Sequence, residues 1–316
     1  MTIAVLNAML RPMLEGRLPD WVEPRWFANS EELLALAPEA EIGWFDTFDL
    51  PGTYEAVRRL QKLKWLNTLA AGVDLFPLDL LREKGVVLTN GARLNATTIA
   101  EYAVMGMLTI AKGWREVVRA QERHEWLTDA PGKAELYGSK ALIIGAGGIG
   151  ARIGVLLRAF GVEVTEVRRK PAPHADNPVL TPGEWQARLG EFDWVIIAVP
   201  STLDTDKMIG ADELAAMKSS AAILNFARGK VIDQSALVAA LREKRIAAAF
   251  LDVTDPEPLP ADDPLWSLDN CHISMHLSGR SQTQLFARNA ERFLENLGRY
   301  ERGELLESKV DLALGY

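Results

Sequence analysis

The sequence is poor in cysteine, in surplus positive charge and in long apolar runs. Its one cysteine, Cys271, excludes an intrachain disulfide, and such sparse usage suits a reducing compartment. Lys and Arg number 35 against 43 for Asp and Glu, and the net charge of -8 argues against duplex nucleic acid as a partner. The longest apolar stretch, residues 99–111, contains Glu101 and is too short to cross a bilayer. At the N-terminus, Arg11-Pro12 interrupts an apolar run that predicts a strand rather than a signal peptide. We therefore expect a cytoplasmic protein that binds neither membrane nor nucleic acid.

Short apolar runs alternate with helical patterns along the chain of 316 residues, which predicts an α/β fold with mainly parallel strands. No internal repeat or low-complexity tract is present. We expect strands at 2–7, 41–45, 64–69, 85–90, 140–145, 162–167, 193–200, 221–227, 247–253 and 272–276.

Two capping patterns predict where the main helices begin. Thr98 and Glu101 have the spacing of a capping box at the start of a long helix that reaches about Arg123. Ser281 and Gln284 have the same spacing ahead of the last helix. Because a complete α/β unit precedes the glycine-rich turn described next, we expect two domains, the first possibly discontinuous.

Gly145, Gly147 and Gly150 have GxGxxG spacing between a β-branched strand and an amphipathic helix. In a doubly wound sheet the first glycine allows a tight turn, the second lets a pyrophosphate approach the backbone, and the third lets helix and strand pack closely. The helix would begin near Gly148 and Ile149 and present free N–H groups to the anion. The turn therefore predicts a Rossmann-like dinucleotide site; the alternative is a turn that merely packs.

Three cations, Arg168, Arg169 and Lys170, follow the next predicted strand. An acid at position 168 would bind the ribose 2′-hydroxyl of NAD, whereas an arginine can pair with a 2′-phosphate. Glu166 could still serve the ribose, although it is expected within the strand, and the cations could simply form a solvated surface run. We favour NADP(H) over NAD(H).

Three stretches end later predicted strands, at the carboxyl edge where such sheets bind ligands, and they contain four chemically useful residues: Arg228, Asp252, Glu257 and His276. A guanidinium can hold a substrate carboxylate and polarise its carbonyl. An imidazole can give a proton to a developing alkoxide, and a neighbouring carboxylate would keep it charged and oriented. Spacing alone does not choose among the five carboxylates of the loop 252–263.

From about residue 60 to the C-terminus, the chain resembles the D-isomer-specific 2-hydroxyacid dehydrogenase family. Several motifs in the family's order carry this resemblance: "LAAGVD" (69–74), "IAEYAV" (99–104), "GAGGIG" (145–150), "AVPST" (198–202), "LNFARG" (224–229), "LDVTDPEPLP" (251–260), "DPLW" (263–266) and "MHLSG" (275–279). Together they are far more specific than the glycine turn.

The resemblance implies roles for individual residues. Arg228 would bind substrate, Glu257 would support His276, and His276 would be the acid/base. Backbone N–H groups of Ala71 and Gly72 would hold the substrate carboxylate.

The resemblance also implies the cofactor contacts and the assembly. Asp252 would face the nicotinamide carboxamide, and further contacts are expected from Val199, Pro200, Ser201, Ala227 and Gly279. A substrate-binding domain of residues 1–98 and 284–316 would accompany a Rossmann-like dinucleotide-binding domain of residues 99–283, both with doubly wound parallel sheets. A homodimer joined through the cofactor domains would follow.

Departures from the family pattern refine the expectation. Met275 stands where the family usually has proline. Arg168 replaces the usual aspartate, which fits the NADPH-preferring glyoxylate and hydroxypyruvate reductases, and Trp44, a candidate wall of the substrate pocket, resembles that subgroup too. Glu257 argues against the formate dehydrogenase branch, which has glutamine there.

We therefore expect an NADP(H)-dependent reductase of small 2-keto acids. Two alternatives stay open: an NAD-dependent dehydrogenase of another D-2-hydroxy acid such as phosphoglycerate, and a dinucleotide-sensing protein without catalysis. No metal site is expected, because Cys271, His272 and His276 would share one extended strand.

Overall fold

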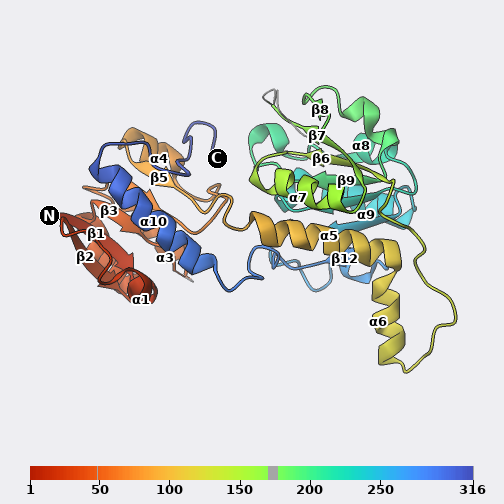
Figure 1. The fold of residues 1–316 in the computed structure, drawn as a ribbon, viewed down its shortest axis with the longest axis horizontal. Coiled ribbons are helices and arrows are strands. Elements are labelled where there is room, and N and C mark those ends of the chain that lie inside the picture. Colours follow the sequence, from red (N-terminus) through yellow and green to blue (C-terminus); the bar gives the residue numbers. More distant parts are fainter. Residues whose placement is uncertain (48, 170–176, 316) are drawn as a thin grey trace. The chain divides into compact units, whose positions relative to one another are not determined.

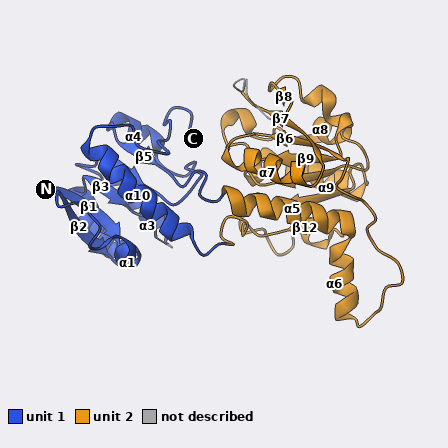
Figure 2. Cartoon of the chain, viewed as in Figure 1, with its two compact units in different colours: residues 1–95, 282–316 blue, residues 96–281 orange. Residues whose placement is uncertain are grey.

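The computed structural model describes residues 1–47, 49–169 and 177–315, which form two compact units. Unit 1 contains residues 1–95 and 282–316, and unit 2 contains residues 96–281 (Figure 2). The prediction of a discontinuous first domain is therefore confirmed. From the sequence, the boundaries were placed at 98/99 and 283/284. No helix in the described part of the chain is long and apolar enough to cross a bilayer.

Unit 1 is a five-stranded parallel sheet with strand order β2-β1-β3-β4-β5. Its strands are β1 (Thr2–Asn7), β2 (Val22–Phe27), β3 (Ile42–Trp44), β4 (Trp65–Asn67) and β5 (Val87–Thr89). Its α-helices are α1 (Arg11–Leu14), α2 (Ser30–Leu36), α3 (Leu50–Arg58), α4 (Leu78–Glu83) and α10 (Leu285–Glu301). Helix α10 joins unit 1 from the far end of the chain (Figure 1).

Both faces of the unit 1 sheet are covered. On one face, residues of α2, α3 and α4 such as Leu33, Val57 and Leu81 pack against the sheet. On the other face, α1 and α10 pack against it, and Phe293 stacks on Trp65 with ring centroids 4.9 Å apart. The result is a three-layer α/β unit, as predicted.

Unit 2 is a seven-stranded parallel sheet with strand order β12-β11-β10-β9-β6-β7-β8. Its strands are β6 (Lys140–Ile144), β7 (Glu163–Val167), β8 (Val179–Leu180), β9 (Trp194–Ile197), β10 (Ala222–Asn225), β11 (Ala248–Leu251) and β12 (Cys271–Ile273). Its α-helices are α5 (Ala96–Lys112), α6 (Trp114–Glu122), α7 (Gly148–Ala159), α8 (Ala211–Ala216) and α9 (Gln234–Arg242). The chain reverses its direction of winding between β6 and β9, and ligands of such sheets bind at that switch point.

Alternate residues of the unit 2 strands face opposite layers. In β6, Ala141 and Ile143 pack with α5 and α7, whereas Leu142 and Ile144 pack with α8 and α9. Because both faces are buried, central strands such as β9 and β11 are continuously apolar, which is why the sequence predicted them. Short 3₁₀ helices complete the fold: η1 (Ala8–Leu10), η2 (Ala37–Glu39), η3 (Gln186–Glu191), η4 (Leu203–Thr205), η5 (Gly229–Val231) and η6 (Pro264–Ser267).

The first predicted capping box is wrong. Helix α5 begins at Ala96, and the hydroxyl of Thr98 donates to the carbonyls of Ser278 and Ser281, 3.1 and 3.0 Å away. The long helix predicted to follow is two helices, α5 and α6, because Gly113 between them has a φ of 60°.

The second capping box is also wrong, and the last predicted strand is present but ends earlier than expected. Helix α10 begins at Leu285, and its N-cap residue, Gln284, makes no side-chain capping hydrogen bond. Strand β12 ends at Ile273, so His276 lies in a turn rather than at the end of a strand.

Candidate active site

The glycine turn between β6 and α7 has the geometry of an anion site. Gly145 has a φ of 97°, and a Cβ there would lie 2.7 Å from the backbone of Ala198. A Cβ on Gly150 would lie 2.3 Å from the carbonyl oxygen of Gly145. Gly147, in contrast, faces open space within 4 Å and forms the N-cap of α7 without a side-chain capping bond. The first N–H groups of α7, including those of Gly148 and Ile149, therefore face a space that a pyrophosphate can enter.

The first cation after β7, Arg168, is held by an internal carboxylate. Arg168 Nε donates to Glu166 Oε2 at 2.6 Å, and the other oxygen of Glu166 accepts from Asn177 Nδ2 at 2.6 Å. Glu166 is only 3% exposed, so its carboxylate is buried and engaged rather than open to a ribose. Arg168 is partly exposed and Arg169 is exposed, whereas Lys170 lies outside the described residues.

The remaining predicted cofactor residues follow strands at the same edge of the sheet. Val199, Pro200 and Ser201 come after β9, Ala227 follows β10, and Gly279 lies beyond β12. Because all these strands are parallel, their carboxyl ends share one edge with the glycine turn.

Asp252, directly after β11, supports the loop that carries the histidine. Its carboxylate accepts hydrogen bonds from Ser274 Oγ at 2.7 Å, from the Ser278 N–H at 3.2 Å and from the Ser278 hydroxyl. Its carbonyl accepts the N–H of His276. Asp252 is 3% exposed, so its carboxylate fixes both sides of the turn around His276.

His276 is paired with Glu257. His276 Nδ1 lies 2.8 Å from Glu257 Oε2, and the side chains are 41% and 37% exposed, so a ligand can reach them. Burial alone would raise the pKa of Glu257, but His276, the N–H of Thr254 and the charge of Arg228 together lower it. An ionised carboxylate only accepts hydrogen bonds, so Nδ1 must donate and Nε2 is left to exchange a proton.

Arg228 follows β10 and is held by its own turn. Its Nη1 donates to the carbonyl of Ala227 at 2.8 Å, and its carbonyl accepts from Asn225 Nδ2 at 3.0 Å. Its positive charge helps to lower the pKa of Glu257. Arg228, Glu257 and His276 thus occupy one edge of one unit.

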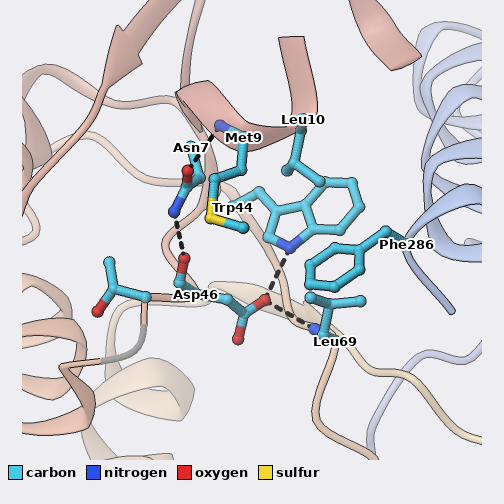
Figure 3. A pocket seen from close by; sticks show the side chains of 8 residues that line it. Asn7, Met9, Leu10, Trp44, Asp46, Leu69 and Phe286 are labelled. Carbon is cyan, nitrogen blue, oxygen red and sulfur yellow. Dashed lines mark hydrogen bonds between the residues drawn. The ribbon is translucent and has the colours of Figure 1, made fainter. Parts of the chain in front are cut away.

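The other predicted substrate residues belong to unit 1. Ala71 and Gly72 are half-buried in the loop after β4, where Asn90 Nδ2 donates to the carbonyl of Ala71 at 2.7 Å. Trp44 is fully buried, and its Nε1 donates to Asp46 Oδ2 at 2.7 Å (Figure 3). The sequence analysis missed Asp46, although an acid directly beyond a strand end was the same signal that singled out Asp252.

Two residues that suggested a metal are accounted for by packing. The ring of His272 lies 6.5 Å from that of Phe250 at an interplanar angle of 18°, and burial lowers the pKa of His272 to about 4. Cys271 is buried, which raises the pKa of its thiol to about 12. Within the described ranges, no group of three or more His, Cys, Asp and Glu side chains could hold a metal ion.

Comparison with known proteins shows which family the chain resembles. A family model described as the NAD-binding domain of D-isomer-specific 2-hydroxyacid dehydrogenases matches residues 104–278. A glyoxylate reductase from Korarchaeum cryptofilum is 32% identical over 264 residues, which cover 81% of this chain and 79% of that protein.

Solved structures of the same class have this fold. A family protein from Aeromonas salmonicida is 27% identical, with a TM-score of 0.86 over 98% of this chain and 99% of that one. A dehydrogenase from Xanthobacter autotrophicus, solved with NADPH and MES, is 25% identical, with a TM-score of 0.80 over 100% and 99%.

Proposed function

Because the chain belongs to the D-isomer-specific 2-hydroxyacid dehydrogenase family, we propose that it reduces a small 2-keto acid with NADPH, glyoxylate or hydroxypyruvate being the first to test. It is thus an oxidoreductase that uses a nicotinamide dinucleotide. One observation carries the proposal: the His276–Glu257 pair lies at the sheet edge that bears the open glycine turn. The positive charge of Arg228 helps to lower the pKa of the Glu257 carboxylate in that pair.

The residues present fit the dinucleotide. The uncapped N-terminus of α7 and the space above Gly147 would hold its pyrophosphate. Val199, Pro200, Ser201, Ala227, Asp252 and Gly279 are proposed as further contacts. When bound, the dinucleotide supplies the hydride.

The protein's own groups would supply the rest of the reaction. We assign the substrate carboxylate to Arg228 and to the N–H groups of Ala71 and Gly72, because a guanidinium and amide dipoles stabilise an anion without moving. As the keto oxygen gains negative charge, His276 Nε2 gives it a proton, and Glu257 stabilises the orientation of the ring through Nδ1.

The preference for NADPH rests on Arg168. Its Nε is held by Glu166, so the rest of the guanidinium keeps a defined orientation at the end of β7. A planar fork of this kind pairs bidentately with a phosphate. Arg169 and Lys170 would add charge to the same site, and no acid at position 168 is available to a ribose hydroxyl.

A homodimer and a cytoplasmic location belong to the same proposal. Trp114, Val118 and Trp126, on and after α6, are 55%, 37% and 94% exposed. Exposed large apolar side chains that gather on one segment mark protein interfaces. Light scattering of the purified protein would measure the subunit number, and a monomer would contradict the dimer.

The direct test is NADPH and NADH oxidation, followed by absorbance, with glyoxylate, hydroxypyruvate, pyruvate, phenylpyruvate and 3-phosphohydroxypyruvate. Turnover of a small unphosphorylated acid with NADPH supports the proposal. Preference for the phosphorylated acid with NADH would instead identify the phosphoglycerate-type dehydrogenase. Tight dinucleotide binding without turnover of any acid would identify a sensor.

A further inference from the structure

We propose that a small apolar cavity in unit 1 receives the side chain of the keto acid and makes the enzyme select short, apolar, uncharged substrates. This inference rests on the proposed function and deepens it. The cavity has a volume of about 100 Å³ and lies beyond the carboxyl ends of β1, β3 and β4 (Figure 3). Its lining residues are Asn7, Met9, Leu10, Trp44, Asp46, Thr47, Leu69 and Phe286.

The position of the cavity connects it to the substrate. Ligands of open α/β sheets bind beyond the carboxyl ends of the strands. Leu69, in its wall, lies two residues before Ala71 in the loop assigned to the substrate carboxylate. A keto acid whose carboxylate is bound by that loop can therefore place its side chain in the cavity. The volume admits a handful of non-hydrogen atoms and excludes a dinucleotide.

The walls are apolar because the polar groups around the cavity bond to one another. Asn7 Nδ2 donates to the carbonyl of Asp46 at 2.8 Å, and Asn7 Oδ1 accepts the N–H of Met9 at 2.9 Å. The Trp44 indole N–H donates to Asp46. These groups thus already have partners, and the surface they leave to a ligand comes from Met9, Leu10 and the aromatic rings.

Asp46 fixes the walls of the cavity. Its Oδ2 accepts from Trp44 Nε1 and from the N–H of Leu69, both at 2.7 Å, and its Oδ1 accepts from Thr68 Oγ1 at 2.6 Å. It therefore positions both the indole wall and the start of the substrate loop. Burial raises the pKa of Asp46, an effect that the donors from Thr68, Leu69 and Trp44 oppose.

No cation compensates this carboxylate among the residues that line the cavity. A phosphate or second carboxylate on the substrate would therefore meet an apolar wall next to an acid, without a counterion. This arrangement disfavours 3-phosphohydroxypyruvate and oxaloacetate. It favours acids such as 2-ketobutyrate, which present only methyl and methylene groups.

The experiment measures kcat/KM with NADPH for glyoxylate, pyruvate, 2-ketobutyrate, 2-ketovalerate and 3-phosphohydroxypyruvate. In the unmodified enzyme we expect about a fourfold gain for each buried methylene, and therefore roughly tenfold or more from glyoxylate to 2-ketobutyrate. The phosphorylated acid should fall at least about tenfold below 2-ketobutyrate.

Two substitutions of Met9, at the mouth of the cavity, test the site in opposite directions. Met9→Trp should fill the cavity and lower kcat/KM for 2-ketobutyrate, relative to that for glyoxylate, by about tenfold or more, because glyoxylate has no side chain to place there. Met9→Ala should shift preference towards 2-ketovalerate. Leu50→Trp is the matched control, because Leu50 and Met9 are 51% and 49% exposed in the same unit and Leu50 does not line the cavity.

The outcomes separate the two proposals. If glyoxylate is reduced but Met9→Trp and Leu50→Trp give the same substrate profile, the cavity does not receive the side chain and this inference is wrong. A preference for the phosphorylated acid would overturn it as well. If no acid, glyoxylate included, is reduced with either dinucleotide, the proposed function itself fails.

Discussion

Replacing Arg168 by glutamine should weaken binding of a 2′-phosphorylated adenosine much more than binding of an unphosphorylated one. Arg168 follows β7, and its Nε donates to the buried carboxylate of Glu166 at 2.6 Å. Its two terminal nitrogens make no hydrogen bond to any residue that the structure describes. The guanidinium is therefore oriented, with its outer edge available to a phosphate.

The structure also limits the magnitude of this effect. A hydrogen bond to a charged group contributes about 1.5–3 kcal/mol, which corresponds to roughly 10- to 150-fold in affinity. Glu166 offsets part of the positive charge, and the Arg168 side chain is 28% exposed and thus screened by water. We therefore expect the lower end, about tenfold.

Calorimetric titration with 2′,5′-ADP and 5′-AMP isolates the phosphate from the rest of the dinucleotide. Arg158→Gln is the matched control, because Arg158 Nη1 donates to Asn177 at 2.8 Å in the same network. Arg158 lies in the last turn of α7, at the opposite end of that helix from the glycine turn. Both variants lose one positive charge, and only Arg168→Gln should lose affinity for 2′,5′-ADP while retaining that for 5′-AMP.

Equal losses in the two variants would show a general charge effect, and no loss in either would show that Arg168 does not bind the phosphate. In both cases NAD becomes the expected cofactor. Arg168→Asp should move the kcat/KM ratio from NADPH towards NADH. That variant also places a second acid beside buried Glu166, so its thermal stability should fall below that of Arg168→Gln.

Four further predictions concern the rest of unit 2. Arg228→Ala should lower kcat/KM for a keto acid by about a hundredfold or more, since it removes the charged anchor proposed for the substrate, and near-normal steady-state kinetics would contradict that role. His276→Gln should retain dinucleotide binding by calorimetry and lose turnover; retained reduction would point to another acid. Gly147→Ala has room for the methyl group and should fold but bind dinucleotide weakly, whereas Gly145→Ala should unfold at lower denaturant concentration because of its positive φ and close backbone contact. Burial lowers the pKa of His272 from 6.5 to about 4, so the unfolded chain binds a proton that the folded chain does not, and stability should decline as pH falls from 6.5 to 4. The full shift corresponds to about 3 kcal/mol, which partial exposure reduces to roughly 2, and denaturation of His272→Phe across that range should show a smaller decline.

The sequence missed two strands, β2 and β8, and each lies at an edge of its sheet. Inner strands such as β9 and β11 are continuous apolar runs, because helices cover them on each side. Strand β2 contains Glu23, Pro24 and Arg25, which break such a run. A proline is tolerated there because β2 is an edge strand of its sheet. An apolar pattern indicates burial, and an edge strand is only partly buried, so its sequence lacks that pattern.

Helix starts were less predictable, because a hydroxyl can bond to distant groups. Thr98 and Glu101 have the spacing of a capping box, but the Thr98 hydroxyl bonds to carbonyls 180 and 183 residues further along the chain. In the candidate site, the hydrogen bonds of Asp46 were equally hard to predict from the sequence. Its position beyond a strand end is visible in the sequence, whereas two of its three donors, Thr68 and Leu69, are 22 and 23 residues away along the chain and only the fold brings them to it.

The turn around His276 depends most on the tertiary structure. Met275 and His276 have φ values of 51° and 55°, and proline, which the family usually has at position 275, cannot adopt such a φ. A left-handed conformation costs roughly 1–2 kcal/mol for each of these residues. Asp252 offsets that cost, because its carbonyl accepts the His276 N–H and its carboxylate binds Ser278 beyond the turn. Glu257 then fixes the ring itself. The orientation of the proposed proton donor is thus imposed by two acids from other segments of the chain, so it does not require the proline.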